Sequence, residues 1–428
     1  MSHPTDRSAD QYRPSLAGPA GRALFDAPFL RTPEASRNIF QVVFLAACGP
    51  LAAGVVFFGW RALLVAVLSV FGCVAAEGLY YRVTRTPALL GRSHAALTGL
   101  LLALTLPAFV PWYVPLAGAV FAIIVAKALF GGVGHFLWQP ALVGRLAVTV
   151  IFAPPLLAEP LLDRPAWPVL AQSRVALGDI DKVNTSFPYR QWRGTPAPPE
   201  ADALARPRPR ELLRQLTLPV EDAPDSIRAA LLRMPPAWDL LCGAYGGGIG
   251  ETCALIIVVA GLYLIYRHYV RGHLPGMFLL AAALTAALSP VRTGPAGEWV
   301  WLPFRSEGYD VGFVYVAYHL TCGELLLAAF FLATEMTSRP VTARGQAIFG
   351  ALCGAAAMLM RLYMTFPIPA YAAVLLANTF TPALDAIVRP RVFGQRRWQD
   401  LRRIPSPAAR LPAGGGQATA RPDAGESA

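Results

Sequence analysis

The sequence predicts an all-α membrane protein: ten transmembrane helices in two inverted five-helix repeats, with short or broken helices among them. Of its 428 residues, 55% are hydrophobic and only 15% are charged, a composition too apolar for an ordinary soluble domain. Ten apolar stretches divide evenly around one long polar connection. Basic residues also alternate between the loops, as they do in proteins that cross a membrane repeatedly.

The apolar stretches fall into two sets of five. The first set covers 39–58, 62–81, 94–106, 112–130 and 140–157. The second set covers 251–270, 274–289, 312–333, 346–364 and 368–388. The third and seventh stretches are short, which is typical of the broken helices of transporter-type folds.

The orientation follows from the loops that are rich in arginine. They come after the second, sixth, eighth and tenth stretches, and the positive-inside rule places such loops in the cytoplasm. We therefore expect a multi-pass protein of the bacterial cytoplasmic (inner) membrane, with both termini cytoplasmic and the long connection outside.

This topology divides the chain into five parts. They are a cytoplasmic N-terminal segment (1–38), the first repeat (39–158), a Pro-rich extracytoplasmic connection with a Gly-rich loop (159–250), the second repeat (251–388) and a basic, then disordered, cytoplasmic tail (389–428). The run that starts at His94 resembles the run that starts at His319, since each leads into a Leu/Ala-rich helix. Five segments per repeat is an odd number, so the second repeat is inverted.

A tight corner joins the fourth and fifth stretches, between Lys127 and Arg145. Gly131 and Gly132 allow a sharp turn next to His135, before Pro140 restarts a helix. Either the function lies near this corner or the glycines serve only helix packing.

Several runs resemble the RnfD/NqrB family, the large membrane subunits of the Rnf and Na⁺-translocating NADH:quinone reductase complexes. They are LTGLLLALTLP (97–107), the corner (127–145), GGIGET (247–252), YHLTCG (318–323), FFLATEMTSRPVT (330–342) and RPRVFG (389–394). The resemblance implies a ten-helix redox subunit that binds flavin and works with the other subunits of an ion-translocating electron transport complex. It also implies an Asp where Glu335 stands and an Asn where Gln139 stands.

Members of this family carry FMN esterified to a Thr in the connection. The matching stretch is 181–189, where Phe187 occupies the acceptor position and has no hydroxyl. Thr185 or Ser186 could accept the phosphate only if the register differs. We therefore expect FMN or riboflavin to be held non-covalently.

A non-covalent flavin needs an apolar slot and, for FMN, a phosphate site. The loop before the sixth stretch leads a flexible backbone into a helix N-terminus, which suits an anion but also suits close packing. Tyr318 and His319 are expected to line the same cavity. The expected cofactor-binding residues are therefore Gly131, Gly132, His135, Gly247, Gly248, Gly250, Glu251, Thr252, Tyr318 and His319.

Ion movement would need charges inside the bundle. Glu324 lies within the eighth stretch and is either part of an ion path or a neutral, hydrogen-bonded core residue. In the first case Glu324→Gln is expected to preserve packing while removing ion movement, and in the second case ion movement should survive. Asn378 is also deep. The charged residues near segment ends are expected only to extend towards the interface, namely Glu77, Lys127, Arg145, Arg361 and Asp385.

Other classes of function are excluded or kept as alternatives. The net charge of +11 comes from segment ends, so no nucleic-acid partner is expected, and the six scattered cysteines predict no metal site. His94, His135 and His319 could in principle ligate haem, although hydrogen bonding at helix ends explains them better. A chain without an NADH fingerprint would not be an enzyme alone. The alternatives are a channel or secondary transporter with inverted repeats, and a cofactor-free scaffold subunit.

Overall fold

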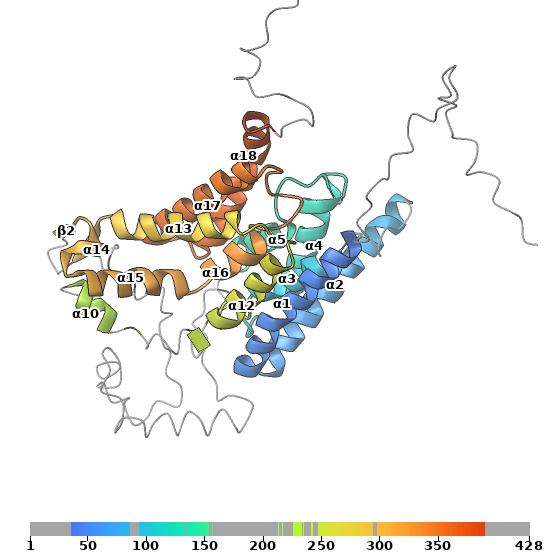
Figure 1. Ribbon diagram of the computed structural model, residues 1–428. Helices are drawn as coiled ribbons and strands as arrows, with labels where there is room; N and C mark the ends of the chain where they lie inside the picture. The colour runs from blue at the N-terminus through green and yellow to red at the C-terminus, as the bar shows by residue number, and fades with distance from the viewer. Residues whose placement is uncertain are drawn as a thin grey trace, which may run out of the picture.

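Helices make up almost all of the regular structure (Figure 1). The computed structural model describes residues 36–389 with gaps at 86–93, 133, 154–155 and 294–297 and across most of 157–246. Within that last range, only 213, 216, 226–232, 234 and 241–242 are described. The expectations for 1–35, for 390–428 and for Thr185, Ser186 and Phe187 lie outside the described residues.

The first half consists of six helical elements in chain order. They are α1 (Ser36–Phe58), α2 (Trp60–Thr84), α3 (Ala95–Thr105), α4 (Tyr113–Val120), the π-helix η1 (Phe121–Ala128) and α5 (Pro140–Ile151). Helix α5 begins at a proline, whose missing N–H costs nothing in a first turn. The Gln139 side chain caps this helix by accepting a hydrogen bond from the Leu142 N–H at 2.7 Å.

The second half contains helices and one short hairpin. Its elements are α12 (Ala254–Tyr266), α13 (His273–Leu288), β1 (Val291–Thr293), β2 (Glu298–Val300), α14 (Pro303–Ser306), α15 (Tyr309–Thr321), α16 (Leu325–Leu327), the π-helix η3 (Ala328–Leu332), α17 (Ala343–Tyr363) and α18 (Pro369–Ile387). Strands β1 and β2 form an antiparallel hairpin. Thr342 caps α17 by accepting from the Gly345 N–H at 3.0 Å.

Each of the ten apolar stretches contains helix in the structure. Among the described residues, α1, α2, α17 and α18 are long and apolar enough to cross a membrane, and the bent pair of α15 with α16 and η3 makes a fifth candidate span. The other five apolar helices are shorter. The chain is therefore a mostly helical, multi-pass membrane protein.

The eighth stretch is broken where the sequence contains Gly323. The chain bends by 65° between Thr321 and Leu325, and Gly323 has a φ of +70°, which a side chain would strain. Helix α3 also stops early, at Thr105, just before Pro107. Both breaks lie in buried parts of the bundle.

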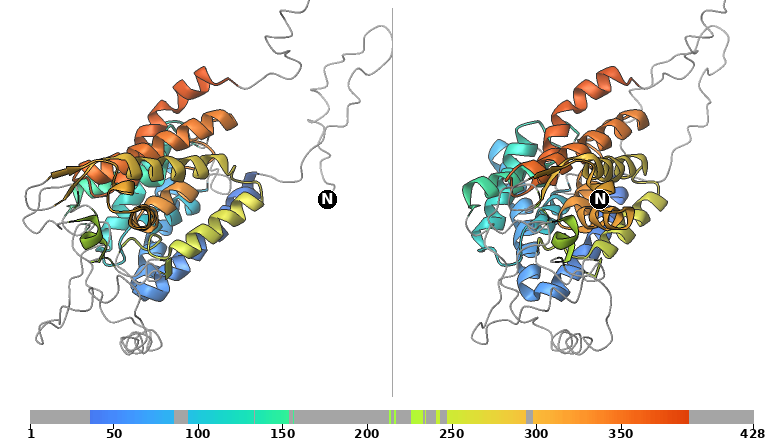
Figure 2. Two further views of the ribbon diagram at one scale, coloured as in Figure 1. Left: turned by 60° about the vertical axis from the view of Figure 1, so that its left-hand side comes forward. Right: turned by 90° about the vertical axis from the view of Figure 1, so that its left-hand side faces the viewer.

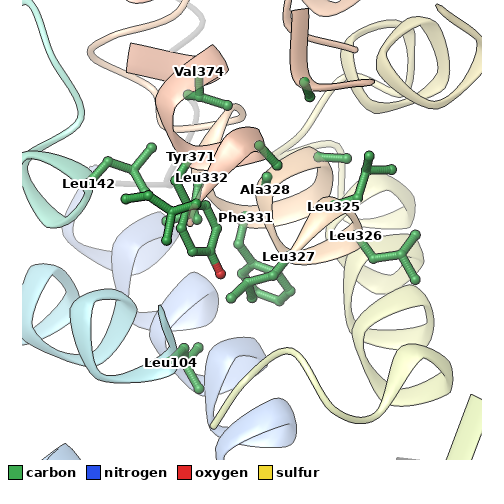
Figure 3. Close-up of a cluster of buried hydrophobic side chains, with 14 of the residues drawn as sticks. Leu104, Leu142, Leu325, Leu326, Leu327, Ala328, Phe331, Leu332, Tyr371 and Val374 are labelled. Atoms are coloured by element: carbon green, nitrogen blue, oxygen red, sulfur yellow. The ribbon is translucent and has the colours of Figure 1, made fainter. Parts of the chain in front are cut away.

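Small residues let the helices approach closely. Gly350 and Gly354 of α17 lie directly against the backbone carbonyls of Leu274 and Phe278 in α13, where a Cβ atom would not fit. Elsewhere large apolar side chains fill the space. Figure 3 shows such a cluster, in which Leu142 of α5 and Leu332 of η3 lie beside the ring of Tyr371 and Leu104 of α3 lies below it.

The two halves meet through two pairs of helices. Helix α12 lies alongside α1, which Figure 2 shows as a yellow helix next to a blue one in the left-hand view. Helix α5 contacts α18 near the opposite corner of the bundle. Trp138 Nε1, just before α5, donates to Thr379 Oγ1 at 3.0 Å.

Part of the long connection docks on the hairpin end. Helix α10 (Ile227–Leu232) is capped by a distant side chain, since the Glu307 carboxylate accepts from the backbone N–H groups of Ile227 (2.7 Å) and Arg228 (2.9 Å). The Arg292 N–H also donates to the Leu216 carbonyl at 2.6 Å. The described part of the connection is therefore fixed to the membrane domain.

Candidate functional site

A buried ion pair marks the end of the bundle that carries the glycine corner. Lys127 Nζ in η1 lies 3.0 Å from Glu77 Oε1 in α2, with both side chains at most 4% exposed. Charges buried to this extent are stable only when they are paired. The prediction that Lys127 and Glu77 extend towards the interface is therefore wrong, because each has its counter-charge inside the protein.

Lys127 lines a pocket together with residues from both halves. This pocket contains about 270 Å³ of empty space, and its walls come from α1, α3, η1, the corner and the segment after η3. The lining residues are Phe40, His94, Leu97, Thr98, Lys127, Phe136, Glu335 and Thr337. The Phe40 and His94 rings are stacked, with centroids 3.7 Å apart.

A second pocket of about 380 Å³ adjoins the first. Phe40, Leu97 and Glu335 line both pockets, and the remaining walls are mainly apolar. They come from Ile39, Val43, Leu101, Leu264, Tyr269, Val270, Phe331, Thr334 and Met336. We call the two together the junction pocket, because α1 and α3 of the first half meet α12 and η3 of the second half there.

The polar groups of the junction pocket lie at one side of it. Glu335 accepts a long hydrogen bond (3.5 Å) from Gln139 Nε2. Burial raises the pKa of Glu335, an effect that Lys127 and the Gln139 hydrogen bond partly offset. Burial, and then the nearby charges of Lys127 and Arg37, lower the pKa of His94 from 6.5 to about 4. His94 is therefore a neutral imidazole at pH 7.

The glycine corner turns the chain but lies outside this pocket. Gly131, Gly132 and Gly134 have φ values between +92° and +96°, so they are turn residues that tolerate no ordinary side chain. His135 is exposed. The corner contributes to the pocket through Lys127 and Phe136, not through Gly131, Gly132 or His135.

The Gly-rich loop before α12 serves close packing. The N–H groups of Ile249 and Gly250 donate to the Leu106 and Leu104 carbonyls at 2.9 and 2.8 Å, so the loop docks on the broken end of α3. A Cβ at Gly250 would lie 2.6 Å from Leu104, and one at Gly248 would lie 2.8 Å from Glu251. Close packing therefore explains why residues 248 and 250 are glycines. A Cβ at Gly247 would have no neighbour closer than 3.7 Å.

Glu251 is buried and is bound from two sides. It accepts from the Gly248 N–H at 3.0 Å and from the Tyr371 hydroxyl, which points down from α18 in Figure 3. Thr252 is fully buried beside it, and its hydroxyl has no partner among the described residues. These groups lie in the centre of the bundle and line neither half of the junction pocket.

Tyr318 and His319 are also buried in the bundle, on α15. Neither lines the junction pocket, so the structure does not bring together all the residues that the sequence nominated. Glu324 is completely buried, as predicted, and its Oε1 lies 3.3 Å from Arg361 Nη2. Arg361 and Arg145 are 3% and 5% exposed, so the prediction that they extend towards the interface is wrong as well.

Sequence reasoning missed the main lining residues. Phe40 and Leu97 have no chemical signature in an apolar stretch, and only the fold brings them together with Glu335. Two signals were present, however. Lys127 opens the corner run, and Glu335 falls within the 330–342 run that carries the resemblance.

Comparison with known proteins decides the family. The model of the NQR2, RnfD, RnfE family matches residues 24–394. The chain belongs to this family. It is 31% identical over 384 residues to the D subunit of the ion-translocating oxidoreductase complex of Halorhodospira halophila (strain DSM 244 / SL1), covering 87% of this chain and 96% of that protein.

Proteins of the same name in two other bacteria give similar values. The Yersinia enterocolitica protein (serotype O:8 / biotype 1B, strain NCTC 13174 / 8081) is 31% identical over 374 residues, or 87% of this chain and 98% of its own. The Escherichia coli (strain SE11) protein is 29% identical over 377 residues, with the same coverage. These relatives match nearly their whole length.

Proposed function

We propose that this protein is the membrane-embedded D subunit of an ion-translocating oxidoreductase complex, in which it holds a flavin non-covalently and relays electrons to other subunits. The family membership and the full-length relatives support the complex. The single observation that supports the flavin is the junction pocket, where apolar walls from both halves meet a buried lysine and a carboxylate.

The proposal includes the ten-span architecture with inverted repeats. Two features of the structure support it. Helices α5 and α18 both begin with Pro-Ala, at Pro140 and Pro369. The helix before each of them carries a buried cation near its end, Lys127 or Arg361, and each cation faces a glutamate.

The junction pocket lies at the cytoplasmic end in this topology. Its walls include Ile39 at the start of the first stretch, Tyr269 at the end of the sixth, and Met336 after the eighth. Alternating arginines place all of these at the cytoplasmic face. A flavin there would be within reach of partner subunits on that side.

The residues of the pocket fit a flavin ring. Phe40, Leu97 and Phe331 offer apolar surface for the ring. Thr98, Thr334 and Thr337 offer hydroxyl groups for the polar edge of the ring. When bound, a flavin would supply the ability to take up and release electrons at this point.

The charge balance supports riboflavin over FMN. Lys127 already faces Glu77, and Glu335 adds a second carboxyl group beside it. A phosphate placed there would meet two carboxyl groups and one paired cation, which is unfavourable. Arg37 helps to lower the pKa of His94, but its side chain is exposed to solvent. A charge at the surface would compensate the charge of a buried phosphate only weakly.

The test is to purify the protein from its own membranes and record its absorption spectrum before and after acid precipitation. The proposal predicts flavin bands, with all the flavin in the acid supernatant. Flavin that stays in the precipitated protein would show a covalent link. Purified protein without flavin that conducts ions by itself would favour the channel or transporter alternative.

A further inference from the structure

A group of buried polar side chains within the second half lies outside the junction pocket. Tyr315 and His319 lie one turn apart on α15, both almost fully buried, with ring centroids 4.5 Å apart in an edge-on arrangement. Neither nitrogen of His319 nor the hydroxyl of Tyr315 has a hydrogen-bond partner among the described residues. Leaving one such group unsatisfied costs about 1–3 kcal/mol, so this grouping calls for water or another ligand.

The same side chains adjoin the buried ion pair. Arg361 Nη1 donates to the His319 carbonyl at 2.6 Å, while Nη2 lies 3.3 Å from Glu324 Oε1. Glu324 also accepts a long hydrogen bond, 3.4 Å, from the Ala370 N–H at the start of α18. The carboxylate thus lies at a helix break and faces a helix N-terminus, an arrangement typical of ion sites in transporters.

A route leads from this group towards the end of the bundle that carries the hairpin. The Arg361–His319 hydrogen bond joins α17 to α15, with Tyr363 two residues after Arg361 and Tyr315 one turn before His319. Tyr363 is 37% exposed, and its hydroxyl donates to the Pro290 carbonyl at 2.8 Å, where α13 has ended. The groups therefore form a series from an exposed phenol to a fully buried carboxylate.

We propose that Tyr363, Tyr315, His319 and Glu324, with water between them, form a proton path, so that the ion moved through this half of the subunit is the proton. This rests on the proposed function, which supplies the redox free energy. A phenol and a neutral imidazole can each accept a proton on one side and release one on the other. The Glu324 carboxylate takes up a proton to become a carboxyl group and then releases that proton again, and no electron moves in these steps.

The surroundings disfavour a metal cation at this place. Na⁺ prefers several oxygen ligands without a neighbouring positive charge, but the Arg361 guanidinium directly faces the Glu324 carboxylate. A proton needs no such set of ligands.

The test uses the assembled complex in sealed membrane vesicles. Electron transfer is started with a reduced viologen dye, a pH-sensitive dye follows proton movement, and radioactive sodium is followed in parallel. The variants are Tyr315→Phe, which removes one hydroxyl, and His319→Gln. Thr285→Val in α13 is the control, since that hydroxyl bonds only to its own helix, at the Ala281 carbonyl.

We expect proton movement per electron to fall about a hundredfold in both variants, the lower end of the effect of a positioned proton-transfer group. The Thr285→Val control should match wild type, and electron transfer measured with an uncoupler should be unchanged in all. If the His319→Gln protein does not accumulate in the membrane, proton movement in Tyr315→Phe alone tests the proposed path. Normal proton movement in Tyr315→Phe, or sodium uptake in place of proton movement in wild type, would overturn the proton path alone. Wild-type vesicles that move neither ion would overturn the proposed function.

Discussion

Glu324 and Arg361 face each other at 3.3 Å inside the membrane domain, with side-chain exposures of 0% and 3%. One comes from the break between α15 and α16, the other from the last turn of α17. A pair buried this deeply is costly to desolvate, but each charge is far more costly without the other. When both are charged, the two residues therefore neutralise each other inside the protein.

The first prediction compares the loss of stability when one residue of the Glu324–Arg361 pair is replaced with the loss when both are replaced. Glu324→Gln or Arg361→Gln alone should lower the free energy of unfolding by roughly 3–5 kcal/mol, because each leaves one buried charge uncompensated. The double variant should lose clearly less free energy of unfolding than the two single variants lose together. Thermal unfolding of the purified subunit in detergent measures all three. Additive losses would show that the two charges do not interact.

This prediction also revises what the sequence implies for Glu324. Since Gln is nearly isosteric with Glu, the sequence alone predicts that Glu324→Gln preserves packing. The structure supplies the missing partner, Arg361, which comes from the far end of the next long helix. A loss of ion movement in Glu324→Gln alone would therefore be ambiguous between a lost path and a damaged fold.

The second prediction concerns the Gly-rich loop. Gly250→Ala should destabilise the protein by about 1–3 kcal/mol, the usual cost of overpacking, because the new Cβ meets Leu104 at 2.6 Å. Gly247→Ala is the matched control, since its nearest neighbour would be 3.7 Å away. Thermal unfolding of both variants is the measurement. Equal stability would contradict the docking of this loop on α3.

The third prediction is a pH dependence. The folded state lowers the pKa of His94 from 6.5 to about 4, so the unfolded chain binds its proton more tightly. The contribution of His94 to stability is therefore complete above about pH 6.5 and is lost as the pH falls towards 4. Glu335, whose pKa is raised, has the opposite dependence.

Comparison of wild type with His94→Phe isolates this effect. Phe preserves stacking on Phe40 but cannot take up a proton. Unfolding curves at several pH values between 7 and 4.5 should show wild type losing stability faster than the variant. Parallel curves would show that His94 does not titrate differently in the folded protein.

The fourth prediction tests the orientation. After Cys48 and Cys242 are replaced by Ser, a membrane-impermeant thiol reagent added outside should label Trp301→Cys and spare His135→Cys. Trp301 is 70% exposed beside the hairpin, and His135 is exposed at the glycine corner. Labelling of the second position from outside would reverse the topology.

The helices were largely predictable from the sequence because lipid demands long apolar runs and internally bonded backbone. That single constraint located α1, α2, α17 and α18 to within a few residues. It did not predict the two π-helices. These carry Lys127 and Phe331 to the junction pocket, and a π-turn depends on how neighbouring helices pack.

The site was harder to predict than the fold. Glycine can turn a chain, approach another backbone or bind an anion, and the sequence does not distinguish these uses. The structure shows turning at Gly131 and Gly132 and close packing at Gly250. The junction pocket needs Phe40 and Glu335 to line the same space, although they lie far apart in the sequence, and no local pattern encodes that.

Flavin binding in the junction pocket is tested most directly by the flavin content of a variant in which that pocket is filled. Leu97 lines both parts of this pocket, so Leu97→Trp should displace the flavin. Val67→Trp adds a similar bulk at a position of α2 that is 55% exposed to the lipid side. We expect acid extracts of purified wild type and Val67→Trp to contain flavin and those of Leu97→Trp to contain none. Undiminished flavin in Leu97→Trp would show that the junction pocket is not the site.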